Sequence, residues 1–224
     1  MKQTHTIASF DIGYRNFSVY VEKIPVKKLG ELKLPPKNLR YNPDGTLTED
    51  MTQVVNEVYR TGEQVLHINT DLTDGKKGEI DMMKVSQAMT AFLDTYRDVW
   101  RKVDIVLVEH QMNFGRMKSN VKATRLSHHC MSYFLIKHPR CSVVEYPAYH
   151  KTQMLGCHKI KGKRGYKAIK KIDRKKWSVE EALRLYEVRC DEDSLNFLRK
   201  SKKKDDLADT LLQLQSYKLG WYVD

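Results

Sequence analysis

The sequence predicts an α/β protein with a central mixed sheet of five strands, three antiparallel strands followed by two parallel ones, flanked by helices. Three observations predict this class. Strand patterns recur through the first 70 residues, helix and strand patterns alternate between residues 80 and 146, and helical patterns dominate from residue 178 onward. A chain of 224 residues can bury a sizeable core without splitting, so we expect a single domain spanning residues 1–224.

The first part of the chain contains the predicted antiparallel strands. Residues 6–11 are nearly all apolar until an acid ends them, and apolar side chains alternate with other residues over 17–21. A short helix near 51–60 and a strand near 64–70 complete this start. The segment 25–50 holds four of the six prolines, which predicts a long loop excursion.

The middle of the chain predicts two helix–strand units. Residues 80–101 place apolar side chains on one helical stripe, and residues 104–109 follow as a continuous apolar run, typical of a strand covered on both faces. A second helix over about 116–137 leads into a short strand at 142–146. Because strands joined through a helix usually run parallel, we expect these two strands to be parallel.

The last part of the chain is predicted to be a basic loop followed by helices. Residues 157–176 are the loop, and its core from residue 159 contains ten Lys or Arg and one acid. Ser178 and Glu181 have the spacing of a capping box, which predicts a helix from there to about residue 189. A final helix is expected to begin near residue 204 or 205.

The charge balance indicates a polyanionic partner. Forty Lys and Arg against 28 Asp and Glu give a formal net charge of +12, which favours nucleic acid. No apolar run approaches the roughly 20 residues of a membrane span, and the start of the chain lacks a secretory signal pattern, so an intracellular location is expected. The four cysteines form no CxxC pair, which argues against a zinc ribbon.

Four acids are the candidate site. Asp11 and Glu109 each end a buried strand, and Asp206 and Asp209 are separated by one helical turn. Acids are also favoured at a helix N-terminus, which is an alternative explanation for Asp205 and Asp206 but accounts less well for Asp209. Carboxylates held close together repel one another unless protons or cations intervene. The pattern therefore predicts a divalent metal site.

These segments also carry a family resemblance. The stretches DIGYRNFSV, VLVEHQ and KKKDDLADTLL resemble the three acidic motifs of the RuvC-like Holliday junction resolvases, in the RNase H-like superfamily, nearest the branch from mitochondria and large eukaryotic DNA viruses, including poxviruses. The resemblance covers about 6–22 and 80–217, and segment 23–79 does not align. It implies an RNase H-like fold in which the four acids (Asp11, Glu109, Asp206 and Asp209) bind two Mg²⁺ ions, with Mn²⁺ as a substitute. Asp205 is the alternative ligand to Asp206.

The function implied is a structure-selective DNA endonuclease. By resemblance it resolves four-way junctions with paired nicks, through two-metal phosphodiester hydrolysis. Two nicks in a nearly twofold substrate imply a C2 homodimer, for which the helix at 116–137 offers apolar surface. A viral replication site or a DNA-containing organelle is the expected location, in a role in DNA recombination or repair.

Basic and polar residues near the acids are the candidate DNA contacts. The basic loop can neutralise phosphates without reading bases, although a merely solvated run of charge is the alternative. Other candidates follow the two acidic strand ends or precede the last helix. The complete set is Arg15, Asn16, Gln111, Arg116, Lys118, Lys161, Lys163, Arg164, Lys167, Lys170, Lys171 and Lys203.

Three other functions compete with junction resolution. Another RNase H-like nuclease, acting on flaps or RNA:DNA hybrids, would use the same four acids. A non-catalytic nucleic-acid-binding protein would share the basic charge but would be expected to lack a carboxylate. An actin-like phosphotransferase is suggested by the DIG motif alone, but that fold needs a second copy of the domain, and the motif occurs once.

Overall fold

The computed structural model describes residues 2–76, 78–110 and 120–224. Within them, five strands form one sheet in the order β3-β2-β1-β4-β5. Strand β2 runs antiparallel to β1 and β3, whereas β4 runs parallel to β1 and β5. The predicted mixed sheet is therefore confirmed. Its strands are β1 (Thr4–Asp11), β2 (Phe17–Pro25), β3 (Glu63–Thr70), β4 (Ile105–Glu109) and β5 (Ser142–Tyr146).

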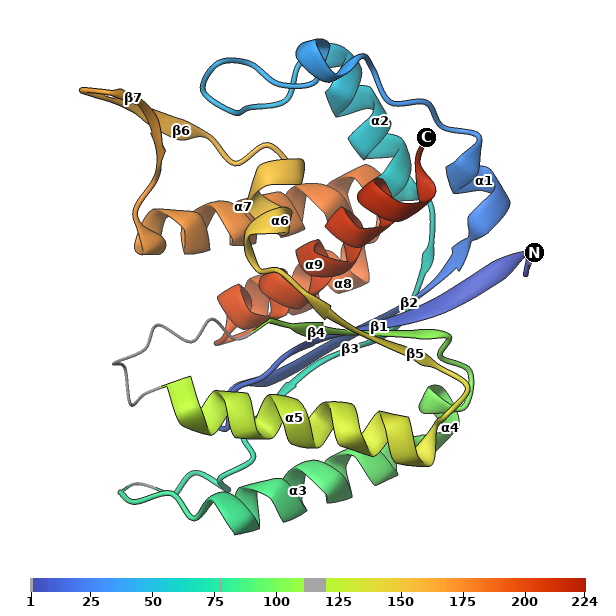
Figure 1. The fold of residues 1–224 in the computed structure, drawn as a ribbon, viewed down its shortest axis with the longest axis vertical. Helices are drawn as coiled ribbons and strands as arrows, with labels where there is room; N and C mark the ends of the chain where they lie inside the picture. The colour runs from blue at the N-terminus through green and yellow to red at the C-terminus, as the bar shows by residue number, and fades with distance from the viewer. Residues whose placement is uncertain (1, 77, 111–119) are drawn as a thin grey trace.

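Helices cover both faces of this sheet (Figure 1). On one face lie α3 (Met82–Thr95), α4 (Arg97–Trp100) and α5 (Asn120–Lys137). The other face carries α2 (Glu49–Arg60), α6 (Tyr149–Met154), α7 (Lys171–Arg189), α8 (Glu192–Lys200) and α9 (Lys204–Tyr222). The remaining elements are α1 (Val26–Gly30), the short 3-10 helix η1 (Lys37–Leu39) and a hairpin of β6 (Lys159–Gly162) and β7 (Gly165–Ala168).

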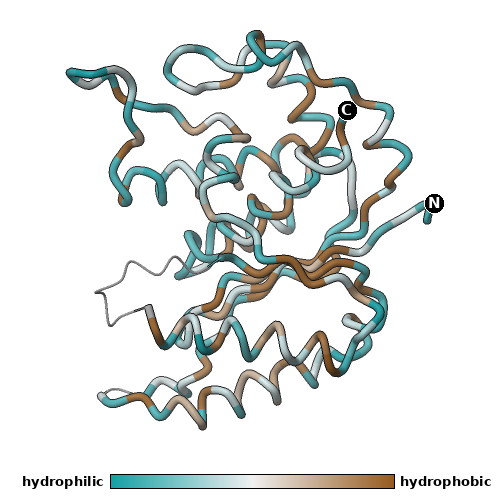
Figure 2. The backbone as a smooth tube through the Cα atoms, viewed as in Figure 1, coloured by the Kyte–Doolittle hydropathy of each residue, from teal (hydrophilic) through white to brown (hydrophobic). Residues whose placement is uncertain are grey.

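The strands supply two hydrophobic cores because successive side chains point to opposite faces. Ile7 of β1 and Leu107 of β4 are buried with the helices around α9. Their neighbours Ala8 and Val106 are buried with α3 and α5. Figure 2 shows the resulting hydrophobic band along the sheet. A strand buried on both faces reads as a continuous apolar run, as predicted for residues 104–109.

A buried ionic network fixes α9 against the sheet. Glu22 of β2 accepts hydrogen bonds at Oε1 from Lys218 Nζ (2.7 Å) and Arg189 Nη2 (2.9 Å). The Glu22 and Lys218 side chains are fully buried. Gly62 lies so close to this carboxylate that a Cβ there would overlap Oε1. These paired charges hold the C-terminal part of α9 in place, and the first turns of the helix are thereby aligned with the edge of the sheet.

The structure corrects several sequence-based expectations. Helix α7 begins at Lys171, and Ser178 is a buried residue inside it, so the capping-box prediction was wrong. The basic loop is instead an ordered hairpin followed by the first turns of α7. The predicted helix 80–101 is two helices that meet at Tyr96. One short helix, α1, and the 3-10 helix η1 occupy part of the proline-rich excursion. Among the described residues, no helix is long and apolar enough to cross a membrane.

Candidate active site

The strand ends bring two of the four acids together. Strands β1 and β4 are parallel neighbours with Phe10 opposite Val108, so the next residues, Asp11 and Glu109, leave the same edge of the sheet. The first turns of α9 bring Asp206 and Asp209 to this edge. All four acids line one pocket of about 520 Å³, which we call the carboxylate pocket. Its lining also includes His110, Ala148, Tyr149, Lys151, Thr152, Lys171, Arg174, Lys175 and Ser178.

Packing determines which face of α9 points into the pocket. Leu207, Ala208 and Leu211 are buried in the core, which leaves the acids between them at the edge of the sheet. His67 of β3 holds the first turn: its Nε2 lies 3.1 Å from the Leu207 carbonyl oxygen, and its Nδ1 lies 2.8 Å from the Tyr186 hydroxyl. Since a carbonyl can only accept, Nε2 donates this hydrogen bond. His67 thus positions the turn that carries the two α9 acids.

Lys151 is a residue of the pocket that the sequence analysis did not select. Its Nζ lies 3.2 Å from Glu109 Oε1 and 3.2 Å from Asp209 Oδ1, and its side chain is only 9% exposed. Burial alone would lower the pKa of Lys151, but the surrounding carboxylates raise it above its ordinary value. The sequence could have pointed to Lys151, because it follows β5 closely. Residues after the carboxyl ends of parallel strands meet at the same edge of a sheet.

The pocket holds more negative charge than Lys151 can balance. Burial, and then Glu109, raise the pKa of Asp11 well above its ordinary value, with further contributions from the α9 acids. Burial and the neighbouring Asp205 raise the pKa of Asp206 to about 6. Asp206 Oδ2 is buried and has no hydrogen-bond partner among the described residues. Both features indicate a site that would bind an added cation or proton favourably.

The donor set fits a hard divalent cation. Carboxylate oxygens are the protein ligands that Mg²⁺ and Mn²⁺ prefer, and the unpartnered oxygen of Asp206 is a ready ligand. In the part of the chain that the structure describes, no three His, Cys, Asp or Glu side chains are arranged as a metal-binding group. Instead, the Lys151 ammonium bridges Glu109 and Asp209. A cation would compete with it for both carboxylates.

The alternative ligand Asp205 is not among the residues that line the carboxylate pocket. It forms an ion pair with Lys175, and the pocket lining includes Asp206 rather than Asp205. Lys175 itself lines the pocket, so this pair borders the four acids from the α7 side.

The candidate DNA contacts fall into four groups. Lys171 lines the carboxylate pocket. Arg15 instead donates to the Lys76 carbonyl, and the described lining includes neither it nor Asn16. The third group comprises the exposed residues of the hairpin and helix starts: Lys161, Lys163, Arg164, Lys167, Lys170 and Lys203. The last group, Gln111, Arg116 and Lys118, lies outside the described residues.

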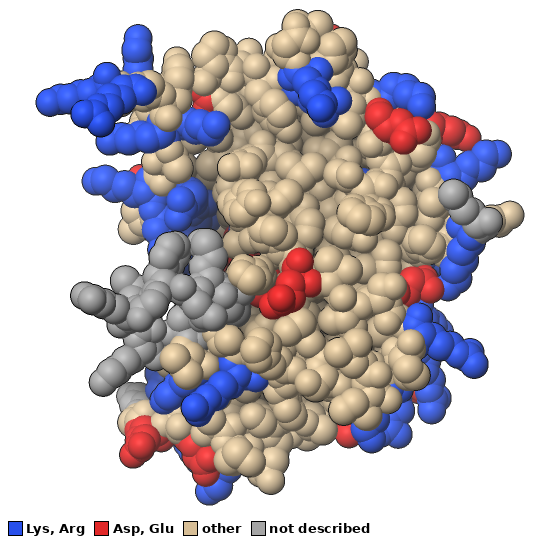
Figure 3. All heavy atoms as spheres, in the orientation of Figure 1, with Lys and Arg blue, Asp and Glu red and all other residues tan. Residues whose placement is uncertain are grey.

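Basic side chains gather beside the pocket. Lys and Arg spheres cluster over the β6–β7 hairpin and the adjoining start of α7 (Figure 3). No acid occurs between residues 159 and 172. Arg174 and Lys175 extend this charge from α7 into the pocket lining. An anionic polymer bound to the hairpin would therefore extend along this basic surface to the four acids.

The comparisons with known proteins agree with this architecture. Uncharacterized protein 97L of Invertebrate iridescent virus 3 is 31% identical over 220 residues, 94% of this chain and 98% of that protein. The chain belongs to the family of protein 97L. Uncharacterized protein 170L of Invertebrate iridescent virus 6 is 29% identical over 228 residues, 95% of this chain and 88% of the relative. No family model matches the sequence.

Solved structures show the fold. RuvC of Thermus thermophilus, in complex with a Holliday junction substrate, aligns over 97% of both chains with a TM-score of 0.54 and 10% identity. The Holliday junction resolvase of fowlpox virus aligns over 96% of this chain and 98% of its own, with a TM-score of 0.50 and 14% identity. The chain therefore has the fold of these two resolvases, as the resemblance implied.

Proposed function

We propose that this protein is a metal-dependent, structure-selective DNA endonuclease that resolves four-way junctions by paired nicks. The observation that carries the proposal is the convergence of four carboxylates, from β1, β4 and α9, in one pocket beside a basic hairpin. The resolvase fold supports the nuclease class. The flanking cations suit a substrate held by its phosphates rather than read by its bases.

The residues that line the carboxylate pocket have different roles in the proposed reaction. The four acids would hold two Mg²⁺ ions, with Mn²⁺ as a substitute. When bound, such ions lower the pKa of a water and stabilise charge on the phosphate oxygens. Lys151 orients Glu109 and Asp209 and reduces their mutual repulsion before a cation binds. Lys171 and Arg174 lie where they can bind the phosphates that flank the cut. The products would carry 5′-phosphate and 3′-hydroxyl ends.

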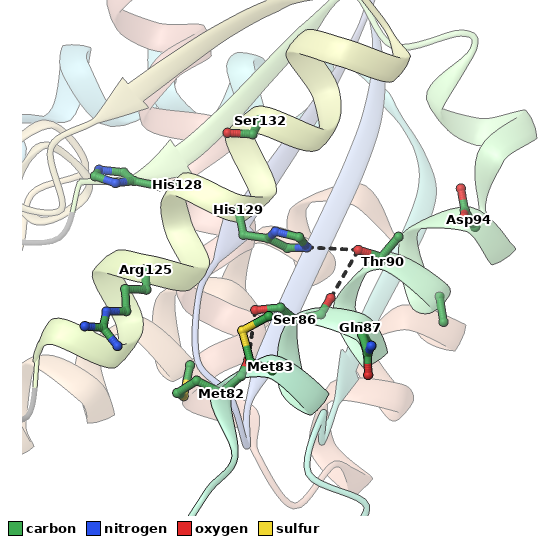
Figure 4. Close-up of a pocket in the computed structure, with 11 residues that line it drawn as sticks. Met82, Met83, Ser86, Gln87, Thr90, Asp94, Arg125, His128, His129 and Ser132 are labelled. Carbon is green, nitrogen blue, oxygen red and sulfur yellow. Dashed lines mark hydrogen bonds between the residues drawn. The ribbon is translucent and has the colours of Figure 1, made fainter.

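Paired nicks require two active sites, and we propose a C2 homodimer with its interface on the α3 and α5 face. Exposed apolar side chains on α5 include Leu135 and Ile136, and Met83 of α3 is 75% exposed. Between the two helices lies a cavity of about 760 Å³ (Figure 4). One wall is fixed by His129, whose Nε2 lies 2.9 Å from Thr90 Oγ1. Light scattering should give twice the chain mass, and Ile136→Glu should give monomers that nick one strand.

The central test compares substrates. A mobile four-way junction, a linear duplex, a flap and an RNA:DNA hybrid are incubated separately with the protein and Mg²⁺. Junction cleavage at least tenfold faster than the others supports resolution, whereas preference for the flap or the hybrid would assign the protein to another RNase H-like activity.

A matched pair of variants tests the site. Asp209→Asn should abolish cutting and retain junction binding, because it removes a ligand oxygen charge while keeping the shape. Asp205→Asn makes the same chemical change one turn away and should retain most of the activity. Mg²⁺-dependent cutting by Asp209→Asn would contradict the assignment, and failure of Asp205→Asn would place Asp205 among the ligands.

A further inference from the structure

A second pocket adjoins the carboxylate pocket. It has a volume of about 460 Å³, within the range of about 300–1,000 Å³ that is usual for ligand sites, and we call it the excursion pocket. Tyr149, Thr152 and Arg174 line both pockets, so the two are adjacent. The far wall is formed by residues 41–45, which belong to the proline-rich excursion that the acidic motifs left unexplained.

Hydrogen bonds hold the far wall of the excursion pocket against the hairpin and α6. The Lys159 backbone N–H donates to the Asp44 carbonyl oxygen (2.6 Å), which joins the excursion to the root of the hairpin. Tyr41 donates through its hydroxyl to the Met154 carbonyl oxygen (3.2 Å) of α6. Gly45 has φ +87°, and a Cβ there would lie 3.2 Å from Lys159 Cε. Three segments distant in sequence therefore build one preformed cavity.

The lining has the chemistry that binds a nucleotide. Tyr149 is 51% exposed and packs its ring beside that of His150, so the ring offers a surface on which a base can stack. Arg174, Lys159 and His158 supply cationic or hydrogen-bonding groups for a phosphate. The adjacent acid, Asp44, is engaged by its own turn, because its Oδ1 accepts from the backbone N–H and the hydroxyl of Thr46.

The short helix α6 links the two pockets. Lys151 directs its ammonium to Glu109 and Asp209, while Tyr149 and Thr152 of the same helix line both cavities. Because Tyr149 lines both pockets and Lys159 at the root of the hairpin lines the second, a DNA strand with its scissile phosphate at the acids can run past Tyr149 toward the hairpin. The nucleotide next to the cut would then lie at the mouth of the excursion pocket.

We propose that the excursion pocket is a nucleotide-binding subsite: it receives an unpaired nucleotide of the cleaved strand next to the scissile phosphate, with the base on Tyr149 and the flanking phosphate on Arg174 and Lys159. This subsite rests on the proposed nuclease function and adds to it a reason for selectivity. Bases at a branch point are less costly to unstack than bases inside a duplex. A linear duplex therefore fills the subsite less readily than a junction.

The test pairs protein variants with modified DNA. Junctions carry a single abasic site placed in turn at each of the three nucleotides on either side of the mapped cut. Their binding is measured by fluorescence anisotropy with Ca²⁺ in place of Mg²⁺. At one position the abasic site should weaken wild-type binding by about fivefold or more, as expected for loss of one stacked base. Tyr149→Ala should weaken binding of the intact junction similarly, with no further loss on the abasic junction.

Two further variants serve as controls. Tyr149→Phe keeps the ring and should bind like the wild type. Lys28→Ala removes an exposed charge on α1, away from the hairpin in Figure 1, and should have less effect than Arg174→Ala. Thermal melting establishes that each variant is folded.

The outcomes separate the two proposals. Suppose that the wild type cuts junctions, but the losses of affinity caused by Tyr149→Ala and by the abasic site multiply at every position. The two changes would then be independent, which would refute the subsite while the nuclease function stands. If the wild type neither binds nor cuts any junction, both proposals fall. The subsite is supported if, at one position, the combined loss of affinity is about fivefold smaller than the product of the two separate losses.

Discussion

Lys151→Met tests whether the lysine stabilises the four acids when no metal is bound. At 3.2 Å and an effective dielectric constant of about 20, each of its two contacts corresponds to roughly 5 kcal/mol of attraction before desolvation is subtracted. Measured losses on removing one partner of a buried ion pair are about 3–5 kcal/mol. We therefore expect the free energy of unfolding in EDTA to fall by about 3 kcal/mol. For a chain of this size, that is a drop of roughly 6–12 °C in Tm.

Added Mg²⁺ should reverse much of this loss. A ligand at 100 times its Kd stabilises the folded state by about 2.7 kcal/mol. The variant should gain more from Mg²⁺ than the wild type does, because the cation no longer displaces an ammonium from Glu109 and Asp209. Urea unfolding and thermal melting, each with EDTA and with Mg²⁺, measure both effects.

The matched control is Lys175→Met. Its ion pair with Asp205 is partly exposed, with 42% of the lysine side chain accessible, so the loss should stay below about 1 kcal/mol. The reasoning is refuted if Lys151→Met melts within 1 °C of the wild type in EDTA, or if Mg²⁺ stabilises both proteins equally.

Three further predictions follow from other parts of the structure. Gly62→Ala places a methyl group against the buried carboxylate of β2 and should lower the free energy of unfolding by about 3–5 kcal/mol. Gly75→Ala, also at positive φ but in open space, should cost only about 1–3 kcal/mol by urea denaturation, and an equal loss in both would refute the steric argument. Burial lowers the pKa of His67 from 6.5 to about 4, so the unfolded chain takes up the proton first: stability is full above pH 6.5 and falls toward pH 4, by about 3 kcal/mol. His67→Gln should lose that part of the pH dependence, and an unchanged profile would show that another group titrates. Replacing Lys161 and Lys163 by Ala should weaken junction binding at all sequences alike and reduce the slope of log K against log salt by about 2, whereas an unchanged slope would mean that the hairpin does not contact phosphates.

Local patterns were sufficient for the framework. The continuous apolar run at residues 105–108 predicted a central strand, and its parallel neighbours and the helix–strand order are as expected. The short helix and strand before residue 70 were also predicted within two residues. Local patterns failed where tertiary contacts override them. Ser178 had the spacing of a cap, yet it is buried within α7, whose start at Lys171 follows the hairpin instead.

The amino-acid sequence by itself determined the fold class and the basic character and selected the four acids as candidates, because strand periodicity, charge and the spacing of acids are local properties. Only the tertiary structure decided that Lys151 bridges Glu109 and Asp209, that Asp205 turns to Lys175, and that the excursion meets the hairpin root. Those contacts join residues tens of positions apart. Their geometry depends on how helices pack across the sheet, which no single segment specifies.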